Sequence, residues 1–440
     1  MDTKQNEFRP AQGAAPFEQG EVFYSRTDKR GVIQSGNYIF RRVADYDWGE
    51  LLGAPHKKIR HPDTPKGLFF LMWERLNRGD IVGAYVKNMA KDGLHYWVYA
   101  VAMPFQDGFL SVRIKPCSDR LQIVEDMYAR ACAREVNDGA TPEDSGAWIT
   151  AQVAEMGFET YDAFAVDSLS EELTAESSAL GIQPDKRIAK SLEMLKITEK
   201  LVVDAAELFE EFTVLAGIPK NMQIKASLLE PTGGPLTALS KNYGHMSDEI
   251  SERFTSQVFG TQNNFAKISQ SVKDAMLLNN TAEILRRCDV QLVAEQQNPD
   301  VIDHADERLH ISGLTAEIRE KARAASNDII SQSTRIDRAC DDIGRILLAL
   351  QTVCVNCKIE NACLGENAGS LDMIIDQLTH SQARVEEQLR VITTSLGQIL
   401  DAAGESNQID IREIGTLPPY GQQMADAATR HSAPPQSMRM

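Results

Sequence analysis

The sequence predicts two fold classes in succession: an α+β domain in which helices flank an antiparallel sheet, and then an all-α antiparallel four-helix coiled coil. The first class is indicated by aromatic residues, which concentrate over residues 21–118 and include three of the four Trp, and by two Asp-Gly turns that join β-rich runs. The second is indicated by apolar residues that recur in alternating steps of four and three over residues 185–403.

The composition is that of an ordinary globular protein with an acidic excess. Of the 440 residues, 42% are hydrophobic and 25% are charged, and the formal net charge is -17. Nucleic acids and anionic membranes are bound through concentrated Lys and Arg, so this charge argues against both partners. No apolar window is long enough for membrane insertion, and the N-terminus lacks the apolar core of a signal peptide. The odd count of seven cysteines favours reduced thiols in a cytoplasm.

The α+β domain is expected after a flexible leader over residues 1–20. Its first half contains two short strands and short helices, followed by one longer helix in "TPKGLFFLMWERLNRG", with Pro65 in its first turn and Gly79 after its end. A three-strand meander follows, because Asp-Gly turns separate "GAYVKNMA", "HYWVYAVAM" and "FLSVRIK".

The remainder of the chain is divided by its apolar periodicity and by its composition. Residues 119–184 are expected to form a helical connector, and residues 185–403 two tandem helical hairpins that build one long four-helix bundle. Residues 404–440, with "TLPPYG" and "SAPPQS", are expected to be disordered.

Two long apolar seams define the predicted bundle, because a narrow stripe at this spacing must be buried against other helices. The first seam consists of Ile336, Cys340, Ile343, Leu347, Leu350, Cys354 and Cys357, and the second of Leu371, Ile375, Leu378, Gln382, Val385, Leu389, Ile392, Leu396 and Ile399.

An internal repeat suggests how the hairpins are arranged. "KNMQIKASLLEPTGGPLTALSKNY" aligns with "VNCKIENACLGENAGSLDMIIDQL", and each has a Gly-containing break between two apolar-periodic arms, as expected of a hairpin tip. Pro299 supplies the return turn, so two nearly equal central arms, each roughly 100 Å long, place both tips at the same end. The matched residues are Asn221 with Asn356, Ile224 with Ile359, and Leu236 with Leu371.

The cysteines beside the second tip have the spacing of a metal site but are better explained by packing. Cys354 and Cys357 continue the first seam, and Cys363 falls off it. A metal site needs three or four converging ligands, and no nearby His or further Cys is evident. We therefore expect no metal.

The block "IRHPDTPKGLFFLMW", followed by "YVKNMAKDGLHYWV", resembles the PAS domain of bacterial aerotaxis receptors. In that family the domain holds FAD non-covalently and senses redox state. The resemblance implies a redox or oxygen sensor and a cofactor site. The site residues that it implies are Asn37, Arg60, His61, Asp63, Phe69, Trp73 and Asn88.

The residues support this site and also a plainer alternative. Arg60 could bind phosphate or carboxylate in a bidentate manner, and Phe69 and Trp73 offer flat faces to a ring. In the alternative, Asp63 only caps the following helix, and the PAS domain is empty or holds a small ligand. Val82 stands where flavin-binding members carry a Trp, which favours this alternative.

The second hairpin tip resembles the signalling tip of methyl-accepting chemotaxis receptors. In that family the tip contacts a coupling protein and a histidine kinase, which implies that Asn356, Glu360, Cys363 and Glu366 form a partner-binding surface here. Cys363 replaces an Arg of the family pattern. Other receptors and a homo-oligomer are further candidate partners, and the repeat lets one chain form a pseudo-dimer.

No catalytic motif is present. The sequence contains no P-loop, nucleophile elbow or H-E-x-x-H, and His380 lacks the flanking pattern of a phospho-accepting His. We therefore expect no enzyme. Two functions remain: a cytoplasmic sensory transducer coupled to a chemotaxis-type complex, and a non-enzymatic scaffold with a cofactor-free PAS docking domain.

Overall fold

The computed structural model describes residues 9–229, 234–260, 263–295, 302–363 and 369–412. The chain divides into two compact units, which are described separately. The first contains residues 1–188 and 276–322, and the second contains residues 189–275 and 323–412.

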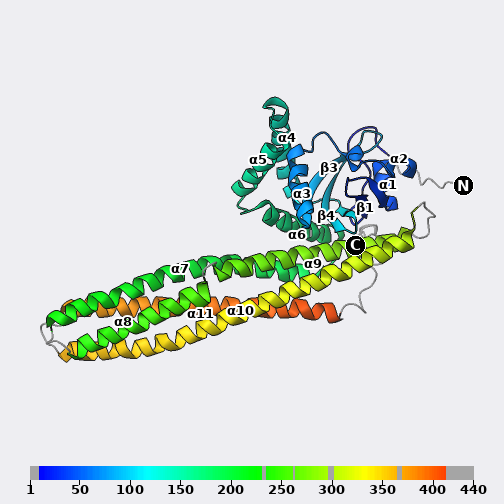
Figure 1. Cartoon of the computed structure of the whole chain (residues 1–440). Helices are drawn as coiled ribbons and strands as arrows, with labels where there is room; N and C mark the ends of the chain where they lie inside the picture. The colour runs from blue at the N-terminus through cyan, green and yellow to red at the C-terminus, as the bar shows by residue number, and fades with distance from the viewer. Residues whose placement is uncertain (1–8, 230–233, 261–262, 296–301, 364–368, 413–440) are drawn as a thin grey trace, which may run out of the picture. The chain divides into compact units, whose positions relative to one another are not determined.

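The first unit is built on a five-stranded antiparallel sheet, as predicted (Figure 1). The strands follow the order β2-β1-β5-β4-β3, so the meander β3–β4–β5 is joined to β1 through β5. Their bounds are β1 Val22–Asp28, β2 Ile33–Gly36, β3 Val82–Met89, β4 His95–Phe105 and β5 Gly108–Ile114.

The two predicted Asp-Gly turns are hairpin turns of this sheet. Gly93 has a φ of 89°, a conformation that side-chain-bearing residues rarely adopt, and it lies between β3 and β4. Gly108 begins β5 where the backbone of β1 comes closest, because a Cβ at this position would lie 1.9 Å from the carbonyl oxygen of Thr27. Both glycines are therefore required by geometry.

One face of the sheet is covered by short helices and one longer helix. The longer helix α3 runs over Lys66–Arg78, directly after Pro65, and ends at Gly79, whose N–H donates to the carbonyls of Arg75 and Leu76. The short helices are α1 Tyr38–Ala44, α2 Trp48–Leu51 and the 3-10 turn η1 His56–Ile59.

The segment that the sequence predicts as a helical connector packs on the other face of the sheet through its last helix and on α3 through its middle helix. It forms α4 Arg120–Asn137, α5 Pro142–Glu155 and α6 Tyr161–Leu180. Tyr85 and Tyr99 project from this face, and their hydroxyls donate to the Glu172 carboxylate and the Ala165 carbonyl of α6. Glu172 also accepts from the backbone N–H of Cys117 and Ser118. The connector is thus attached to the sheet by buried hydrogen bonds.

The segment expected as a flexible leader is packed against this domain from Arg9 onward. The N–H of Ala15 donates to the carbonyl of His95 at 2.7 Å, and the Phe17 ring lies 5.2 Å from the Phe23 ring. Residues 1–8 lie outside the described part of the chain.

The helical region begins with α7 and contains the arms of both predicted hairpins. Its elements are α7 Lys186–Leu229, α8 Pro235–Arg253, the π-helical turn η2 Phe254–Phe259, α9 Asn264–Glu295, α10 His304–Cys363 and α11 Gly369–Arg412. In the second unit these helices form a four-helix antiparallel bundle, and the last residues of α7 and α10 lie at the same end of it as the first residues of α8 and α11 (Figure 1). The predicted return turn at Pro299 and the tail beyond residue 412 lie outside the described residues.

The predicted seams are buried in this bundle. Every residue named in the two seams is buried, including Cys354, Cys357 and the polar Gln382. The thiol of Cys354 lies 3.5 Å from the Thr379 hydroxyl, which places the α10 seam against α11. The 3.5-residue apolar repeat therefore identified the buried stripes of α10 and α11 correctly.

The first central arm is not continuous, unlike the prediction. It changes to a π-helical turn at Phe254 and ends at Gly260, which has a φ of 71°. A new helix, α9, starts at Asn264, whose amide nitrogen donates to the carbonyl of Val258. Gly and Asn favour such a break, because they tolerate positive φ or bind neighbouring backbone groups.

The internal repeat has the same burial pattern in both copies. This agreement follows the gapless alignment and supports two equivalent hairpins within one chain. Met222 and Cys357, Ala226 and Asn361, and Leu236 and Leu371 are buried, whereas Ile224 and Ile359 are exposed.

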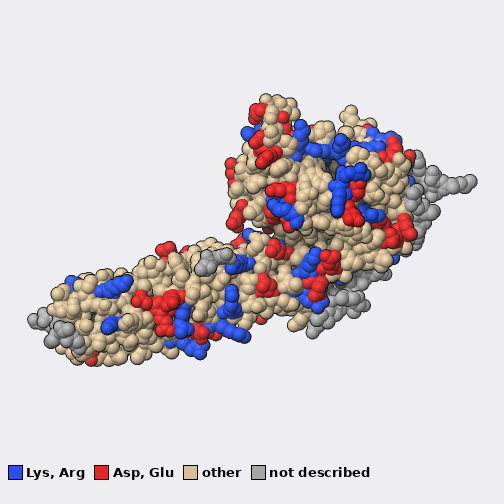
Figure 2. All heavy atoms as spheres, viewed as in Figure 1, with Lys and Arg blue, Asp and Glu red and all other residues tan. Residues whose placement is uncertain are grey.

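Among the described residues, no helix has both the length and the apolar character needed to cross a membrane. Acidic and basic side chains are interspersed over the face drawn in Figure 2, without a broad basic area.

Candidate ligand-binding site

A cavity of about 370 Å³ lies in the sheet domain, between the sheet and the η1–α3 segment. Ligand sites of proteins span about 300–1,000 Å³, so this cavity is large enough for one ring system. The sheet contributes Ser25, Thr27, Val86, Asn88, Ala100, Ala102, Phe109, Ser111 and Arg113, and the opposite wall includes His56, Arg60, Phe69, Met72, Trp73 and Leu76.

Strand alternation explains which sheet residues reach the cavity. Successive side chains of a strand point to opposite faces, so Phe109, Ser111 and Arg113 of β5 share one face. Ala100 and Ala102 lie beside them on β4, in register with Arg113 and Ser111. These small residues leave the space that larger side chains would fill.

Arg60 and Phe69 form one wall. The Arg60 guanidinium lies 3.9 Å from the centre of the Phe69 ring, and it donates to the carbonyl of Thr64 at 3.0 Å. Burial lowers the pKa of Arg60, and no described carboxylate lies within 4.0 Å of it. Trp73 stacks edge-on against Phe109 at 5.2 Å, and both line the cavity. A cation and flat apolar faces therefore surround the same space.

Asn88 is the most clearly unsatisfied residue of the cavity. It is buried at 2% exposure, and its amide nitrogen has no hydrogen-bond partner among the described residues. An unpaired buried amide costs about 1–3 kcal/mol, so a ligand acceptor placed here would be favoured.

Four of the seven site residues implied by the resemblance line the cavity, and three do not. Arg60, Phe69, Trp73 and Asn88 line it. His61 and Asp63 belong to the turn before α3, where His61 Nδ1 accepts from the Asp63 N–H at 3.1 Å. The alternative role of Asp63, as a cap of α3, is not observed. Its carboxylate accepts from Lys87 Nζ at 2.6 Å, and this ion pair lowers the pKa of Asp63.

Asn37 is a structural residue rather than part of the cavity. Its amide oxygen accepts from the backbone N–H of Tyr24 and Phe40, so it caps α1 and holds it to β1. Its amide nitrogen donates to the carbonyl of Val22 and to Glu295 of α9, each at 3.0 Å. Every polar atom of this side chain is thereby used.

The residues that sequence reasoning missed are Ser25, His56 and Arg113. Arg113 Nη1 donates to Ser25 Oγ at 2.9 Å and to the Ser111 carbonyl, and Arg113 Nη2 lies 2.8 Å from His56 Nε2. Burial, with a smaller effect of Arg113, lowers the pKa of His56 to about 3, and burial lowers that of Arg113 to about 10. His56 is therefore neutral at neutral pH and accepts from a charged Arg113. The sequence signal that could have identified Arg113 is its place as a charged residue at an inward position of the strand "FLSVRIK".

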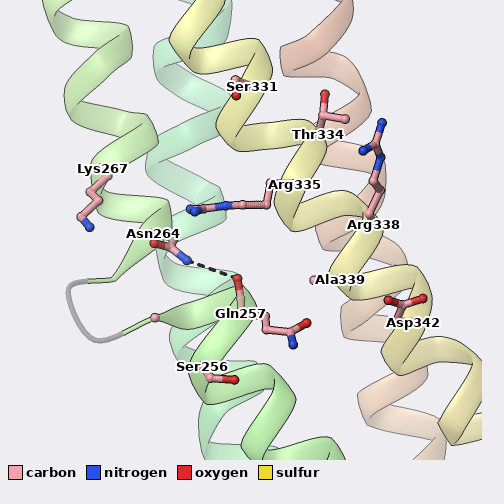
Figure 3. Close-up of a pocket in the computed structure, with 11 residues that line it drawn as sticks. Ser256, Gln257, Asn264, Lys267, Ser331, Thr334, Arg335, Arg338, Ala339 and Asp342 are labelled. Carbon is pink, nitrogen blue, oxygen red and sulfur yellow. Dashed lines mark hydrogen bonds between the residues drawn. The ribbon is translucent and has the colours of Figure 1, made fainter.

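A second hollow, of about 900 Å³, lies in the helical bundle beside the break at Gly260 (Figure 3). Arg335 of α10 extends toward Asn264 of α9, whose amide donates to the carbonyls of Gln257 and Val258. Arg335 and Arg338 are exposed, and the Asn264 amide nitrogen already has partners. The hollow is thus an open polar groove with no side chain that needs a ligand.

The predicted partner surface at the second tip is described in part. On α10, Asn356 and Cys363 are exposed and Glu360 is half-buried, whereas Glu366 lies outside the described residues.

All seven cysteines have free thiols. Within the described part of the chain, no three His, Cys, Asp or Glu side chains are grouped so that they could hold a metal ion.

Comparisons with known proteins place this cavity in a recognised domain. Residues 36–111 match the family described as the PAS fold. The aerotaxis receptor of Escherichia coli (strain K12) is 36% identical over 118 residues, which are 26% of this chain and 23% of that receptor. The match therefore spans about a quarter of the receptor.

Two solved structures resemble the chain weakly. The PAS domain of a protein from Colwellia psychrerythraea has 18% identity and a TM-score of 0.19, covering 21% of this chain and 85% of its own. The blue-light activated histidine kinase of Erythrobacter litoralis EL346 has 10% identity and a TM-score of 0.22, and the match covers 40% of this chain and 58% of the kinase chain. Scores this low carry no weight for the architecture.

The conclusion rests on the sequence match and on the sheet that the matched residues form. Residues 36–111 contain β3, β4, most of β5, the short helices and α3, and thus most of the cavity wall. The chain carries a PAS sensor domain related to that of an aerotaxis receptor, followed by a long helical region.

Proposed function

We propose that this protein is a cytoplasmic sensory transducer that catalyses no reaction. A ligand in the PAS cavity changes the domain, and the helical bundle passes the change to a chemotaxis-type complex. The observation that carries this proposal is a formed cavity in the region that matches an aerotaxis receptor, with Arg60, Phe69, Trp73 and Asn88 on its wall.

FAD is the cofactor that we propose first, and the residues present fit its ring. The buried amide nitrogen of Asn88 needs an acceptor, and a flavin ring carries carbonyl oxygens and ring nitrogens. Phe69 and Trp73 offer apolar surface, and Arg60 suits a phosphate. The volume of about 370 Å³ suits the ring rather than the whole cofactor. When bound, FAD would supply reversible oxidation and reduction, which makes the domain a redox sensor.

The output surface that we propose is the hairpin-tip end of the bundle. Large apolar side chains are exposed there. Soluble proteins usually bury such side chains, and a group of them at the surface is typical of a partner-binding site. They are Ile224 and Leu228 of α7, Val355 and Ile359 of α10, and Met373 of α11. A coupling protein and a histidine kinase are the partners that we propose, because both bind such tips in chemotaxis receptors.

A reconstitution experiment tests this function. The purified full chain is mixed with a chemotaxis coupling protein and its histidine kinase, and complex formation and kinase autophosphorylation are measured. We expect a complex and a change in kinase activity. A chain that binds neither protein, while it is folded by circular dichroism, would contradict the transducer.

One observation favours the scaffold instead. Val82, which stands where flavin-binding relatives carry a Trp, is buried and paired with Ala102 in the β3–β4 ladder. It therefore provides no stacking ring. The scaffold predicts a colourless protein, and an Arg60→Ala variant that keeps all of its protein contacts.

A further inference from the structure

Arg113 is a buried cation without a counter-ion. Its side chain is on β5, and the residue is 4% exposed. Its hydrogen-bond partners are the Ser25 hydroxyl, the Ser111 carbonyl and the His56 ring, all of which are neutral. Among the described residues, no carboxylate oxygen lies within 4.0 Å of its guanidinium. Buried charges in proteins are normally paired, so this arrangement requires an explanation.

The aromatic neighbours of Arg113 position its guanidinium but do not neutralise it. The guanidinium lies 5.5 Å from the centre of the Phe23 ring and 6.0 Å from that of Phe40. Such contacts stabilise a cation by about 0.5–2 kcal/mol, less than the cost of burying an unpaired ion. The net positive charge therefore remains.

The whole cavity shares this charge imbalance. Its wall includes the cations Arg30, Lys57, Arg60 and Arg113, but no Asp or Glu. Arg30 is paired with Asp28, which is not part of the wall. The uncompensated positive charge is therefore concentrated at the more buried Arg60 and Arg113. In a chain of net charge -17, a cavity without acidic residues is notable. Its potential selects anions over neutral molecules of the same shape.

A second group points to a ligand independently. Asn88 of β3 lines the same cavity with an unpartnered, buried amide nitrogen. Between the Asn88 and Arg113 strands lies β4, whose Ala100 gives the cavity a small, apolar floor. A ligand that satisfies both groups has a flat apolar body, an anionic group and a hydrogen-bond acceptor.

We propose that the PAS cavity binds aromatic carboxylates, with the carboxylate paired to Arg113 and the ring between Ala100 and the α3 side chains. Ser25 and His56 hold the guanidinium in place for this pair. The inference rests on the proposed function in one respect, that the cavity is the ligand site, and it names aromatic carboxylates as the alternative to FAD in that site.

The test compares a charged probe with its neutral isostere. Binding of 2-naphthoate and 2-naphthamide to the full chain is measured by isothermal titration calorimetry. We expect naphthoate to bind at least tenfold more tightly, because a hydrogen bond to a charged group is worth about 1.5–3 kcal/mol. In Arg113→Gln this preference should fall to about twofold, and in Arg113→Lys part of it should remain. Arg78→Gln, an exposed arginine of α3 outside the cavity, is the matched control.

Each contrary result is decisive. Equal binding of the two probes, or a preference that persists in folded Arg113→Gln, would overturn the inference. If that variant does not fold, the comparison of the two probes on the native chain and on Arg113→Lys still decides. The inference is also overturned if neither 2-naphthoate nor 2-naphthamide binds.

The visible spectrum of the same preparation separates this inference from the proposed function. A yellow protein that binds neither probe overturns the carboxylate inference and supports FAD in the cavity. A colourless protein that prefers naphthoate supports the inference and removes FAD. Failure to bind the coupling protein and kinase refutes the transducer without changing either result.

Discussion

At the scale of single residues, the function depends on which side chains face the PAS cavity. Arg60, Phe69, Trp73 and Asn88 do, and Asp63, from the same sequence block, instead pairs with Lys87 at the surface. Neighbours in a motif therefore differ in role, because the turn before α3 directs successive side chains to different environments. Substitutions within the motif should separate these roles.

Asn88→Ala and Asp63→Asn should differ in their effect on cofactor binding. We expect Asn88→Ala to weaken FAD binding by about tenfold, since it removes the buried amide donor, and Asp63→Asn to leave it within about twofold. Fluorescence quenching in an FAD titration of the full chain measures both. An equal loss in the two variants would show that the turn contributes directly to the site.

The sequence predicted the cavity residues only in part, for a local reason. A quoted motif such as "RHPD" gives adjacency along the chain, whereas cavity lining depends on the direction of each side chain. Arg113 was missed because an inward charge on a short strand is rare, and nothing in one sequence shows that its neighbours Ala100 and Ala102 leave a hole. Asn37 was misplaced because helix capping and ligand binding favour the same residue type.

At the scale of elements, buried carboxylates connect the PAS sheet to helices inside the first unit. Glu295 of α9 accepts from the Asn37 amide and from the Tyr38 N–H. Glu307 of α10 accepts from Arg26 of β1 at 2.7 Å. Glu176 of α6 pairs with Arg287 of α9. A change in the sheet has direct polar contacts through which to reach α9 and α10.

The Glu295 contact should make folding pH-dependent. Burial raises the pKa of Glu295 from 4.5 to about 7, so between these values the folded chain binds a proton that the unfolded chain has released. The free energy of unfolding should therefore fall as pH rises through this window, by on the order of 3 kcal/mol in total.

Urea denaturation at several pH values measures this effect, and Glu295→Gln serves as the control. The variant lacks the titrating group, so its stability should change less between pH 4.5 and 7 than that of the native chain. Parallel profiles for the two proteins would remove Glu295 as the cause.

Breaking the Glu176–Arg287 ion pair should destabilise the first unit strongly. Arg287 is buried between Glu176 and Glu283, and its replacement by Met leaves the buried Glu176 carboxylate without its cation, whereas Glu283 keeps Arg286. We expect a loss of about 3–5 kcal/mol in the free energy of unfolding. Arg390→Met, an exposed arginine of α11, should cost less than about 1 kcal/mol. A loss below 1 kcal/mol for Arg287→Met would contradict the buried pair.

At the scale of the whole chain, the sequence predicted the helical architecture better than its details. The seams and the repeat were sufficient for a four-helix bundle, because the 3.5-residue period requires burial of one stripe. The break at Gly260 was missed, since the apolar period continues on both sides of it. The contacts of α9 and α10 with the PAS sheet were also missed, because they are made by single polar residues such as Glu295 and Glu307.

The tip end of the bundle should carry the output without contributing much stability. Ile359 is 57% exposed, so Ile359→Glu should reduce binding of the coupling protein at least tenfold and change the free energy of unfolding by less than about 0.5 kcal/mol. Leu371→Ala, at a buried seam position, is expected to cost about 2–5 kcal/mol. Pull-down assays and urea denaturation measure the two effects. Normal binding by Ile359→Glu would place the partner surface elsewhere.

The central claim is that the PAS cavity is the ligand site, and a cavity-filling variant tests it most directly. Ala100 lies on the floor of the cavity, so Ala100→Leu places three further carbon atoms in the space of a ligand ring. The measurement is native mass spectrometry of the purified full chain and of this variant, beside their absorption spectra. We predict a bound small molecule in the native chain and none in folded Ala100→Leu. The same molecule bound equally in both proteins, or in neither, would contradict the account.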